Sequence, residues 1–225
     1  MNSVHLDLDK EVKRCQSLAP MARGVGQHHG DLRQALISAA LDLIADSDSD
    51  ELTLRAVARR AGVSSAAPYH HFADKNALLA AVARDGFEAL GAVQLEVLAR
   101  PGSPQDRLER LVNEYVLFAL RHPTHYRLMF RTPPSRVEGA EAAPLREVAL
   151  GTFGRLVEAV NAVNVRISAQ EAARRALLGW AMAHGAIEVS QWALGLSPGL
   201  DPESFAADVG RAVGRLASED EASEN

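Results

Sequence analysis

The sequence predicts an all-α fold of about nine helices, and three observations point to it. Hydrophobic residues make up 47% of the 225 positions, but aromatic residues make up only 5%, and alanine and leucine dominate the apolar set. Runs of valine, isoleucine and aromatic residues that alternate with polar residues are missing, so strands are not expected. Apolar residues instead recur at spacings of three and four, the period of a helix with one buried face.

The N-terminal third contains signals for four helices. Thr53 and Asp74 are suited to cap two of them, and Ser64 or Ser65 can cap a short one that precedes Asp74. Gly62 ends the helix that Thr53 opens, because glycine readily adopts the backbone conformation that terminates helices. These four helices are expected at residues 32–44, 54–61, 64–71 and 76–100.

Five more helices are expected in the remainder of the chain. The pattern SAQE (168–171) is typical of a capping box, in which the side chains at both ends bind each other's backbone amides. Asp201 is a suitable cap for the last helix, and Pro202 fits its first position. The stretch RTPPSRVEGAEA (131–142) reads as a loop. The five helices are expected around residues 108–119, 124–130, 145–160, 168–194 and 201–217.

Composition excludes some classes of protein. The single cysteine, Cys15, rules out an internal disulfide and suits a reducing compartment. No apolar run reaches the length of about 18 residues that spans a membrane, and the charged start MNSVHLDLDKEVKRCQ does not resemble a secretory signal. We therefore expect a cytoplasmic protein with no membrane partner. Residues 1–27 lack periodicity and predict a flexible arm; order begins after Met21, so both Met1 and Met21 are candidate natural starts.

The second and third expected helices, joined by a tight turn at Gly62, match the helix-turn-helix pattern. Small residues after the turn permit close approach to a DNA groove, and hydroxyls and imidazoles supply hydrogen bonds to phosphates or bases. From Thr53 to Lys75 there are four basic residues and one acidic residue, a local balance of +3 within a chain of net charge −5. Double-stranded DNA is therefore the expected partner. A metal site at His70-His71 is disfavoured, because adjacent helical residues point about 100° apart and no cysteine lies nearby.

The segment TLRAVARRAGVSSAAPYHHFADKNALLAAV closely resembles the DNA-binding region of TetR-type transcriptional regulators. The shared marks are the capping threonine, A-x-x-A-G-V-S at the turn, Y-x-H-F after it, and a lysine followed by A-L-L. The resemblance covers roughly residues 28–85 and implies a regulator rather than an enzyme, with no cofactor. His71 and Phe72 would pack the turn, whereas Pro68 departs from the usual apolar residue and fits only a first helical turn. The DNA contacts that the resemblance implies are Thr53, Arg55, Ser64, Ser65, Ala66, Ala67, Tyr69, His70 and Lys75.

In this family the later helices usually form a ligand-binding and dimerisation domain. The pattern W-x-x-x-H-G formed by Trp180, His184 and Gly185 resembles the C-terminal type named WHG after those letters. Trp180 and His184 share a helix face, which is compatible with core packing as well as with ligand contact. No arrangement of catalytic or metal-binding residues is apparent. The candidate pocket residues are Tyr115, Phe118, His122, Tyr126, Met129, Phe130, Phe153, Trp180 and His184.

Together these observations predict a flexible arm (1–27), a three-helix helix-turn-helix DNA-binding domain (28–75), a helical ligand-binding and dimerisation domain (76–217, with a linking helix at 76–100) and an acidic tail (218–225). The last two helices are the expected homodimer interface, because two copies would form a four-helix bundle. The function expected is a homodimeric repressor released from a pseudo-palindromic operator by a small-molecule effector. The alternatives are a ligand-independent regulator or activator controlled by a protein partner, and a helical metal-binding or enzymatic module.

Overall fold

The computed structural model describes residues 28–46, 52–131, 133–193 and 201–219. No strand occurs within these ranges, which confirms the predicted all-α class. The expected arm (1–27), the candidate start Met21 and most of the acidic tail (220–225) lie outside the described residues. The described part of the chain contains eight α-helices: α2 (His28–Asp46), α3 (Leu54–Arg60), α4 (Lys75–Ala99), α5 (Pro104–Arg121), α6 (Pro123–Arg131), α7 (Ala142–Val163), α8 (Ala169–Ala193) and α9 (Pro202–Ser218). Three short 3-10 helices accompany them: η2 (Ala67–His70), η3 (Pro134–Arg136) and η4 (Gly139–Glu141).

Local capping fixes where α3 and α4 begin. The Thr53 side chain accepts a hydrogen bond from the Ala56 amide at 3.1 Å, and Asp74 accepts one from the Ala77 amide at 2.8 Å. Gly62 follows α3 with a φ of +69°, a left-handed conformation that favours glycine. Both caps and the glycine turn lie where the sequence predicts them. The turn brings η2 back against α3.

The third expected helix differs in kind from the prediction. A turn at residues 65–66 leads into the four-residue 3-10 helix η2, in place of a regular helix that starts at Ser64. Pro68 explains the difference, because its nitrogen carries no hydrogen to donate to the Ser64 carbonyl. Ala67 donates to that carbonyl instead, at 3.0 Å, and Tyr69 donates to Ala66 at 3.2 Å. These bonds span three residues, as in a 3-10 helix.

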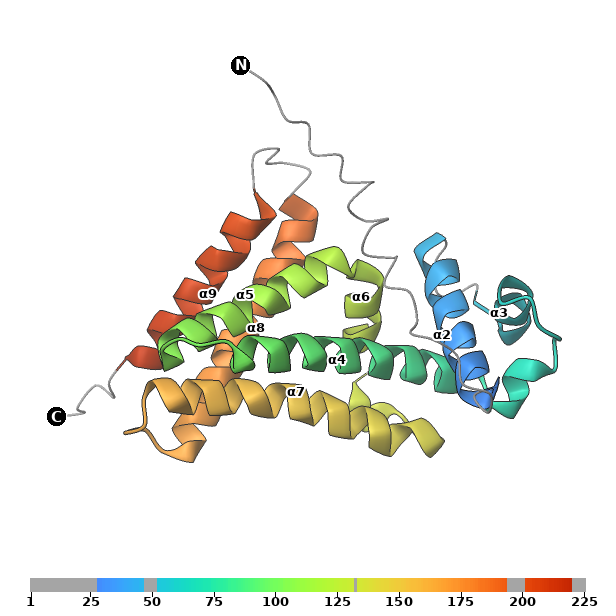
Figure 1. Ribbon diagram of the computed structural model, residues 1–225, viewed down its shortest axis with the longest axis horizontal. Coiled ribbons are helices and arrows are strands. Elements are labelled where there is room, and N and C mark those ends of the chain that lie inside the picture. The colour runs from blue at the N-terminus through green and yellow to red at the C-terminus, as the bar shows by residue number, and fades with distance from the viewer. Residues whose placement is uncertain (1–27, 47–51, 132, 194–200, 220–225) are drawn as a thin grey trace, which may run out of the picture.

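The helix-turn-helix occupies one end of an elongated molecule, and the remaining helices form a bundle at the other end (Figure 1). The long helix α4 runs between the two parts, with α7 packed along it. Helices α5 and α9 lie side by side, and α8 crosses behind them. Separate apolar cores hold the two parts. The first is built around Leu36, Ile37, Val57, Phe72 and Leu78, and the second around Leu108, Leu111, Val116, Leu145 and Ile187.

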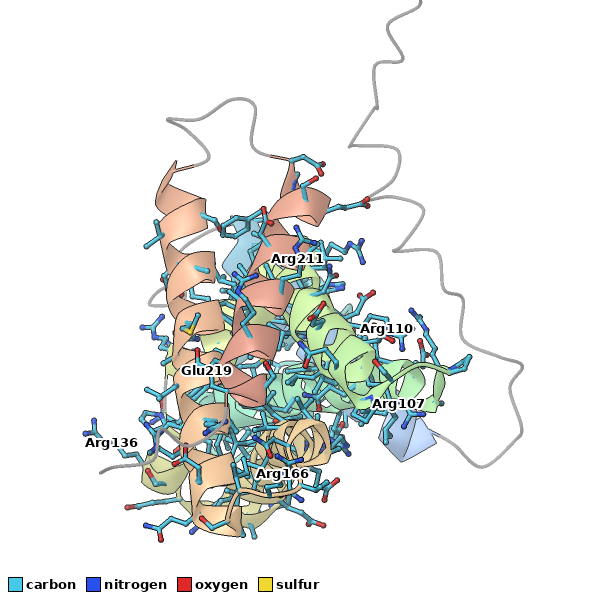
Figure 2. All side chains as sticks on the ribbon, turned by 90° about the vertical axis from the view of Figure 1, so that its left-hand side faces the viewer. Arg107, Arg110, Arg136, Arg166, Arg211 and Glu219 are labelled. Atoms are coloured by element: carbon cyan, nitrogen blue, oxygen red, sulfur yellow. The ribbon has the colours of Figure 1, made fainter. Side chains whose placement is uncertain are left out.

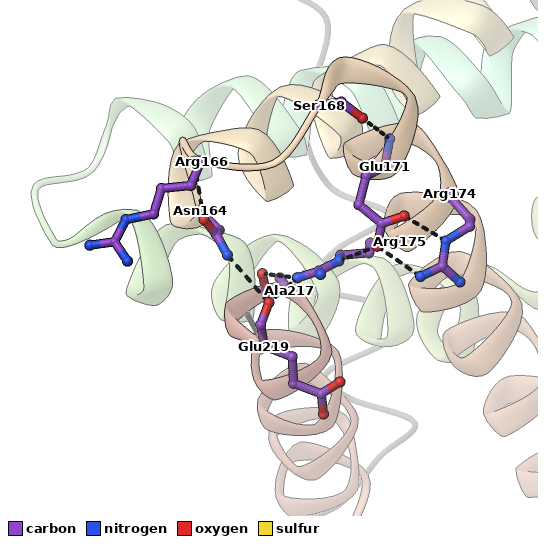
Figure 3. A network of polar contacts seen from close by, with 8 residues as sticks. All are labelled: Asn164, Arg166, Ser168, Glu171, Arg174, Arg175, Ala217 and Glu219. Atoms are coloured by element: carbon purple, nitrogen blue, oxygen red, sulfur yellow. Dashed lines mark hydrogen bonds and ion pairs between the residues drawn. The ribbon is translucent and has the colours of Figure 1, made fainter. Parts of the chain in front are cut away.

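A cluster of polar groups holds the end of α9 (Figure 3). Arg175 on α8 is only 5% exposed; it donates to the carbonyls of Ala217, at 3.1 Å, and Glu219. These carbonyls have no partner within α9, because a helix leaves its last four carbonyls unbonded. Asn164 also donates to the Glu219 carbonyl, at 3.3 Å. Arg175 therefore joins α8 to the end of α9.

The predicted capping box at the start of α8 is only half formed. The Ser168 hydroxyl accepts from the Glu171 amide at 3.1 Å, as the pattern predicts. The Glu171 carboxylate does not return to Ser168; it accepts from Arg174 at 2.7 Å and from Arg175 at 2.6 Å. Two guanidinium groups outcompete one neutral amide for a carboxylate, and they lower the pKa of Glu171 to about 2.

Candidate DNA-binding surface and ligand cavity

The residues expected to contact DNA gather at the helix-turn-helix end of the molecule (Figure 1). Tyr69 is 55% exposed, an unusual position for a large aromatic side chain. Ala67 and Lys75 are half-buried. The others are exposed: Thr53, Arg55, Ser64, Ser65, Ala66 and His70. The surface therefore combines small side chains with hydrogen-bonding ones, but its DNA contacts remain predictions.

The positive charges on this surface differ in their surroundings. Arg55 and Arg59 are exposed, and neither forms an ion pair within the described ranges. Arg60 instead turns toward α2, where its guanidinium pairs with Asp46 and lies 4.0 Å from Asp42. Arg60 thus contributes to the packing of α3 on α2, and Arg55 and Arg59 are better placed for phosphates.

Phe72 packs the turn from below, as expected. Its side chain is 1% exposed, and the Arg33 guanidinium lies 5.2 Å from its ring centre. The His71 ring lies 6.3 Å from the Phe72 ring. Pro68 is also buried. Phe72 and Pro68 thus support the surface from inside, whereas His71 is half-buried.

A partly open cavity of about 390 Å³ lies in the C-terminal bundle, lined by residues of α4, α5, α6, α7 and α8 and by the segment after α6. This volume falls in the range of small-molecule sites, roughly 300–1,000 Å³. No lining side chain is charged at neutral pH. The cavity is lined by Phe87, Gln94, Leu111, Val112, Tyr115, Met129, Phe130, Pro133, Pro134, Ala149, Thr152, Phe153, Leu156, Gly179, Trp180, Ala183 and His184.

The sequence-based candidates divide into three groups. Six line the cavity: Tyr115, Met129, Phe130, Phe153, Trp180 and His184. Tyr126 lies behind the wall, 1% exposed, and Phe118 belongs to the bundle core. His122 is exposed at the C-terminal end of α5, outside the cavity. Among the lining residues that sequence reasoning missed, Gln94 carried a usable signal, because it is a polar residue within an otherwise apolar stripe of α4.

A chain of hydrogen bonds connects the aromatic side of the cavity. The Trp180 Nε1 donates to the Tyr115 hydroxyl at 3.1 Å. Tyr115 donates to the Tyr126 hydroxyl at 3.4 Å, and the Tyr126 oxygen lies 2.6 Å from Nδ1 of His184. The chain thus ends at His184, whose ring also meets Phe130 edge-on, with centroids 4.8 Å apart. Trp180 and His184, four residues apart in α8, share this wall.

Burial sets the protonation states of this chain. It raises the pKa of Tyr115 to about 12 and raises the pKa of Tyr126 as well, so both are protonated at neutral pH. Burial lowers the pKa of His184, against a smaller opposing effect of Glu188. The imidazole of His184 is therefore neutral at pH 7.

The opposite wall is closed by its own bonds. Gln94 is 6% exposed; its amide nitrogen donates to the Thr152 carbonyl at 3.2 Å, and its oxygen accepts from Arg155 at 3.3 Å. The Thr152 hydroxyl donates to the Ala149 carbonyl at 2.8 Å. These polar groups are already paired with protein atoms.

Helix α6 lies between the cavity and the helix-turn-helix. Met129 and Phe130 line the cavity, whereas Leu128 belongs to the apolar core of the DNA-binding part. His125 Nε2 lies 3.1 Å from Asp85 on α4, and Asp85 also accepts from Gln34 on α2 at 2.9 Å. The hydrogen bond from His125 is the main reason why the pKa of Asp85 lies below its usual value.

A second polar cluster joins the same parts. Glu141, in η4 before α7, accepts from Arg33 of α2 at 2.7 Å and lies 3.4 Å from Arg84 of α4. The Glu141 side chain is only 12% exposed. These side-chain contacts therefore hold α2 against the C-terminal part, in addition to the covalent link through α4.

An exposed apolar face runs along α8. Its large members are Leu178 (42% exposed), Met182 (44%) and Val189 (63%), and Leu177 (52%) lies beside it around the helix. Gly185 lies on the same face, and a Cβ there would meet no atom of this chain within 4 Å. Contiguous exposed apolar surface of this kind marks interaction sites in proteins. The exposed face of α9 is more polar, with Asp208, Arg211 and Arg215.

The comparisons with known proteins agree with this arrangement. Residues 36–82 match the family of bacterial regulatory proteins of the tetR type, and residues 108–212 match the tetracyclin repressor-like C-terminal domain. The chain belongs to the TetR family. The matches do not specify the WHG type, which remains a prediction. TetR-family proteins are transcriptional regulators rather than enzymes, which agrees with the class expected from the sequence.

Relatives of known name cover part of the chain. The HTH-type transcriptional regulator BetI of Klebsiella pneumoniae (strain 342) is 43% identical over 82 residues, 36% of this chain. The matched region spans only 42% of that relative's length.

Solved structures match more of the TetR fold. A protein of unknown function from Rhodococcus sp. RHA1 is 31% identical, with a TM-score of 0.70 over 85% of this chain and 98% of the other. A TetR-family transcriptional regulator from Bordetella parapertussis 12822 is 17% identical, with a TM-score of 0.62 over 81% of this chain and 93% of the other. The latter likeness concerns the fold alone.

Two features are absent from the described part of the chain. No three His, Cys, Asp or Glu side chains in those ranges come together as a metal ion would need. No helix within them is both long enough and apolar enough to cross a bilayer.

Proposed function

We propose that this TetR-family chain is a homodimeric repressor that binds a pseudo-palindromic operator and leaves it when a small molecule occupies the C-terminal cavity. The observation that carries the proposal is the combination of two sites at opposite ends of α4: an exposed helix-turn-helix surface and an uncharged cavity. Such a regulator acts in the cytoplasm, where bacterial DNA lies.

The proposed DNA contact uses the exposed groups on either side of Gly62. Arg55 would hold a phosphate, and Tyr69 and His70 would reach phosphates or base edges, since all three are exposed. Ser65 and Ala66 are small enough to let the backbone approach the groove. The short η2 presents fewer positions to the bases than a full recognition helix would, so phosphate contacts carry more of the affinity.

The proposed dimer forms through α8, with α9 at its edge. The apolar face around Met182 and Leu178 is too large to be left in water without cost. Gly185 would let the partner's helix approach closely. A two-fold axis through this face would place two helix-turn-helix units on one side of the dimer, and half-sites about one DNA turn apart suit that symmetry.

The proposed release runs through α6. A ligand beside Met129 and Phe130 would press on α6, whose other side holds Leu128 in the DNA-binding core and His125 on Asp85. Gly86 of α4 lies against Met129, where an added Cβ would come within 2.9 Å of its side chain. Movement of α6 would therefore shift α4 and the helix-turn-helix attached to it. A fully packed C-terminal part would have favoured a ligand-independent regulator; the cavity supports the ligand-responsive one.

The experiment that tests the DNA-binding role is fluorescence anisotropy of the purified protein with the DNA upstream of its own gene and with shuffled DNA. Specific binding should exceed non-specific binding by about 10³-fold or more. Its affinity should fall as salt rises, because phosphate contacts release counterions. Absence of any preference for that DNA, and for any sequence selected from random DNA, would contradict the proposal.

Arg55→Ala is the variant that tests the surface. It should weaken operator and shuffled DNA alike, by about tenfold, and reduce the salt slope by about one unit per protomer. Arg166→Ala is the matched control, because Arg166 is an exposed arginine at the far end of the molecule (Figure 2). Equal losses in both variants would show a general charge effect and would argue against a contact at Arg55.

A further inference from the structure

The hydrogen-bond chain in the cavity wall determines which nitrogen of His184 carries its proton. Trp180 can only donate, so the Tyr115 oxygen accepts at the head of the chain. The three hydrogens on Trp180 and the two tyrosines then face three acceptors: the two hydroxyl oxygens and Nδ1 of His184. Every hydrogen has an acceptor only if Nδ1 is unprotonated.

The alternative tautomer leaves a buried hydrogen without a partner. A proton on Nδ1 would have to be donated to the Tyr126 oxygen, 2.6 Å away, and the hydroxyl hydrogen of Tyr126 would then lack an acceptor. Tyr126 is 1% exposed, so water does not readily replace that acceptor. An unpaired buried donor is costly. The neutral ring of His184 therefore carries its hydrogen on Nε2.

That Nε2–H is the hydrogen-bonding group that the cavity offers to a ligand. Within the described ranges it has no protein partner, and it is not among the fully buried atoms that lack one. The other polar lining groups are engaged: Trp180 and Tyr115 in the chain, Gln94 and Thr152 on the opposite wall.

Charge and volume restrict the ligand further. With no charged lining residue to pair with it, a buried ionic group would be strongly disfavoured. A cavity of about 150 Å³ accommodates benzene, so the 390 Å³ here corresponds to about 15 non-hydrogen atoms. Phe130, Phe153 and Trp180 favour flat apolar groups on the remaining walls.

We propose that the cavity takes an uncharged, largely aromatic molecule of this size with one hydrogen-bond acceptor, such as a ketone or ester carbonyl, that accepts from Nε2–H of His184. This inference rests on the ligand-binding role proposed above for the cavity. It assigns the chemical class of the ligand, and it makes His184 the residue that selects for the acceptor.

Three related probes test the class by isothermal titration of the full chain: benzophenone, diphenylmethane and diphenylacetate. Benzophenone carries the acceptor, diphenylmethane lacks it, and diphenylacetate places a negative charge at the same point. Benzophenone should bind about tenfold more tightly than diphenylmethane, the effect of one hydrogen bond to an otherwise unpaired donor. Diphenylacetate should bind most weakly of the three.

His184→Phe should abolish the preference for benzophenone over diphenylmethane, because it keeps an aromatic ring and removes the donor. His122→Phe is the matched control, since His122 lies outside the cavity and is exposed, and it should keep the preference. A preference retained in His184→Phe would overturn the proposal. So would equal binding of benzophenone and diphenylmethane, tighter binding of diphenylacetate, or binding of none of the three.

The tautomer is measurable in the unaltered protein. Nitrogen-15 NMR of labelled histidine should show His184 protonated at Nε2 at pH 7, and protonation at Nδ1 would overturn the inference even if the variants fail to fold. Operator binding, measured separately by anisotropy, distinguishes the two proposals. A chain that prefers benzophenone but binds no DNA would refute the repressor and leave the ligand class standing. A chain that binds its operator but shows no preference for benzophenone would refute the ligand class and leave the DNA-binding proposal standing.

Discussion

Arg175 illustrates how a single buried side chain can hold two helices together. Its guanidinium bonds the Glu171 carboxylate on its own helix and two carbonyls at the end of α9 (Figure 3). A buried cation is tolerated only when it is paired and hydrogen-bonded, and Arg175 satisfies both conditions. Its contribution is therefore structural, and it is separate from the DNA surface and from the cavity.

Arg175→Met should lower the free energy of unfolding by about 2 kcal/mol, because the Ala217 carbonyl loses its side-chain donor and the Glu219 carbonyl keeps only the one from Asn164. Urea unfolding followed by circular dichroism measures the change. Arg174→Met is the matched control: Arg174 binds the same carboxylate but is 61% exposed, so its loss should cost less than about 1 kcal/mol. Equal losses would indicate that the carbonyl contacts contribute nothing.

At the scale of the elements, the contact between α5 and α9 depends on the lack of a side chain at Gly210. A Cβ at this position would lie 2.5 Å from the Glu109 carbonyl oxygen, a backbone atom that cannot move aside by rotating a side chain. Gly210→Ala should therefore destabilise the fold by about 1–3 kcal/mol, despite the better helix propensity of alanine. Thermal unfolding tests this.

Gly154→Ala is the control for that prediction. Gly154 also lies inside a helix, α7, but an added Cβ would meet no atom within 4 Å. This variant should gain roughly 0.5–1 kcal/mol from reduced backbone entropy in the unfolded chain. Stabilisation in both variants would mean that α5 and α9 are packed less closely than the structure indicates.

The elements that could be predicted from sequence depend on short-range signals. Thr53, Asp74 and Asp201 each bind an amide three residues away, so a local window is enough to identify the helix starts. The kind of helix at η2 is harder to predict, because it depends on how the backbone bonds around Pro68 rearrange when its nitrogen cannot donate.

The candidate site could be predicted only in part, because it depends on contacts between distant segments. Arg33 and Glu141 are 108 positions apart, and Tyr126 and His184 are 58 apart. Aromatic residues at helical spacing predict burial, but spacing does not distinguish Phe118, in the core, from Phe130, at the cavity. That distinction arises from how five helices meet.

At the scale of the whole molecule, the apolar face of α8 predicts association. Met182→Glu places a charge in the middle of this face and should convert the proposed dimer into a monomer in sedimentation equilibrium, because a buried unpaired charge is strongly unfavourable. Operator affinity should fall together with dimerisation, since each monomer would then bind a single half-site on its own. Leu150→Glu is the control, because Leu150 is a large apolar side chain of α7 that is 64% exposed away from this face. A Met182→Glu protein that stays dimeric would place the interface elsewhere.

The two-sided helix α6 has a consequence for protein engineering. This nine-residue helix lines the cavity with one side, and its other side packs into the apolar core of the helix-turn-helix part. A chimera that joins this cavity to the helix-turn-helix of another regulator therefore cannot be made with a single junction in α4. The residues at positions Leu128 and His125 must be replaced to fit the new helix-turn-helix, while Tyr126, Met129 and Phe130 must be kept for the cavity. The cavity and the helix-turn-helix are therefore not interchangeable parts, since they share one short helix.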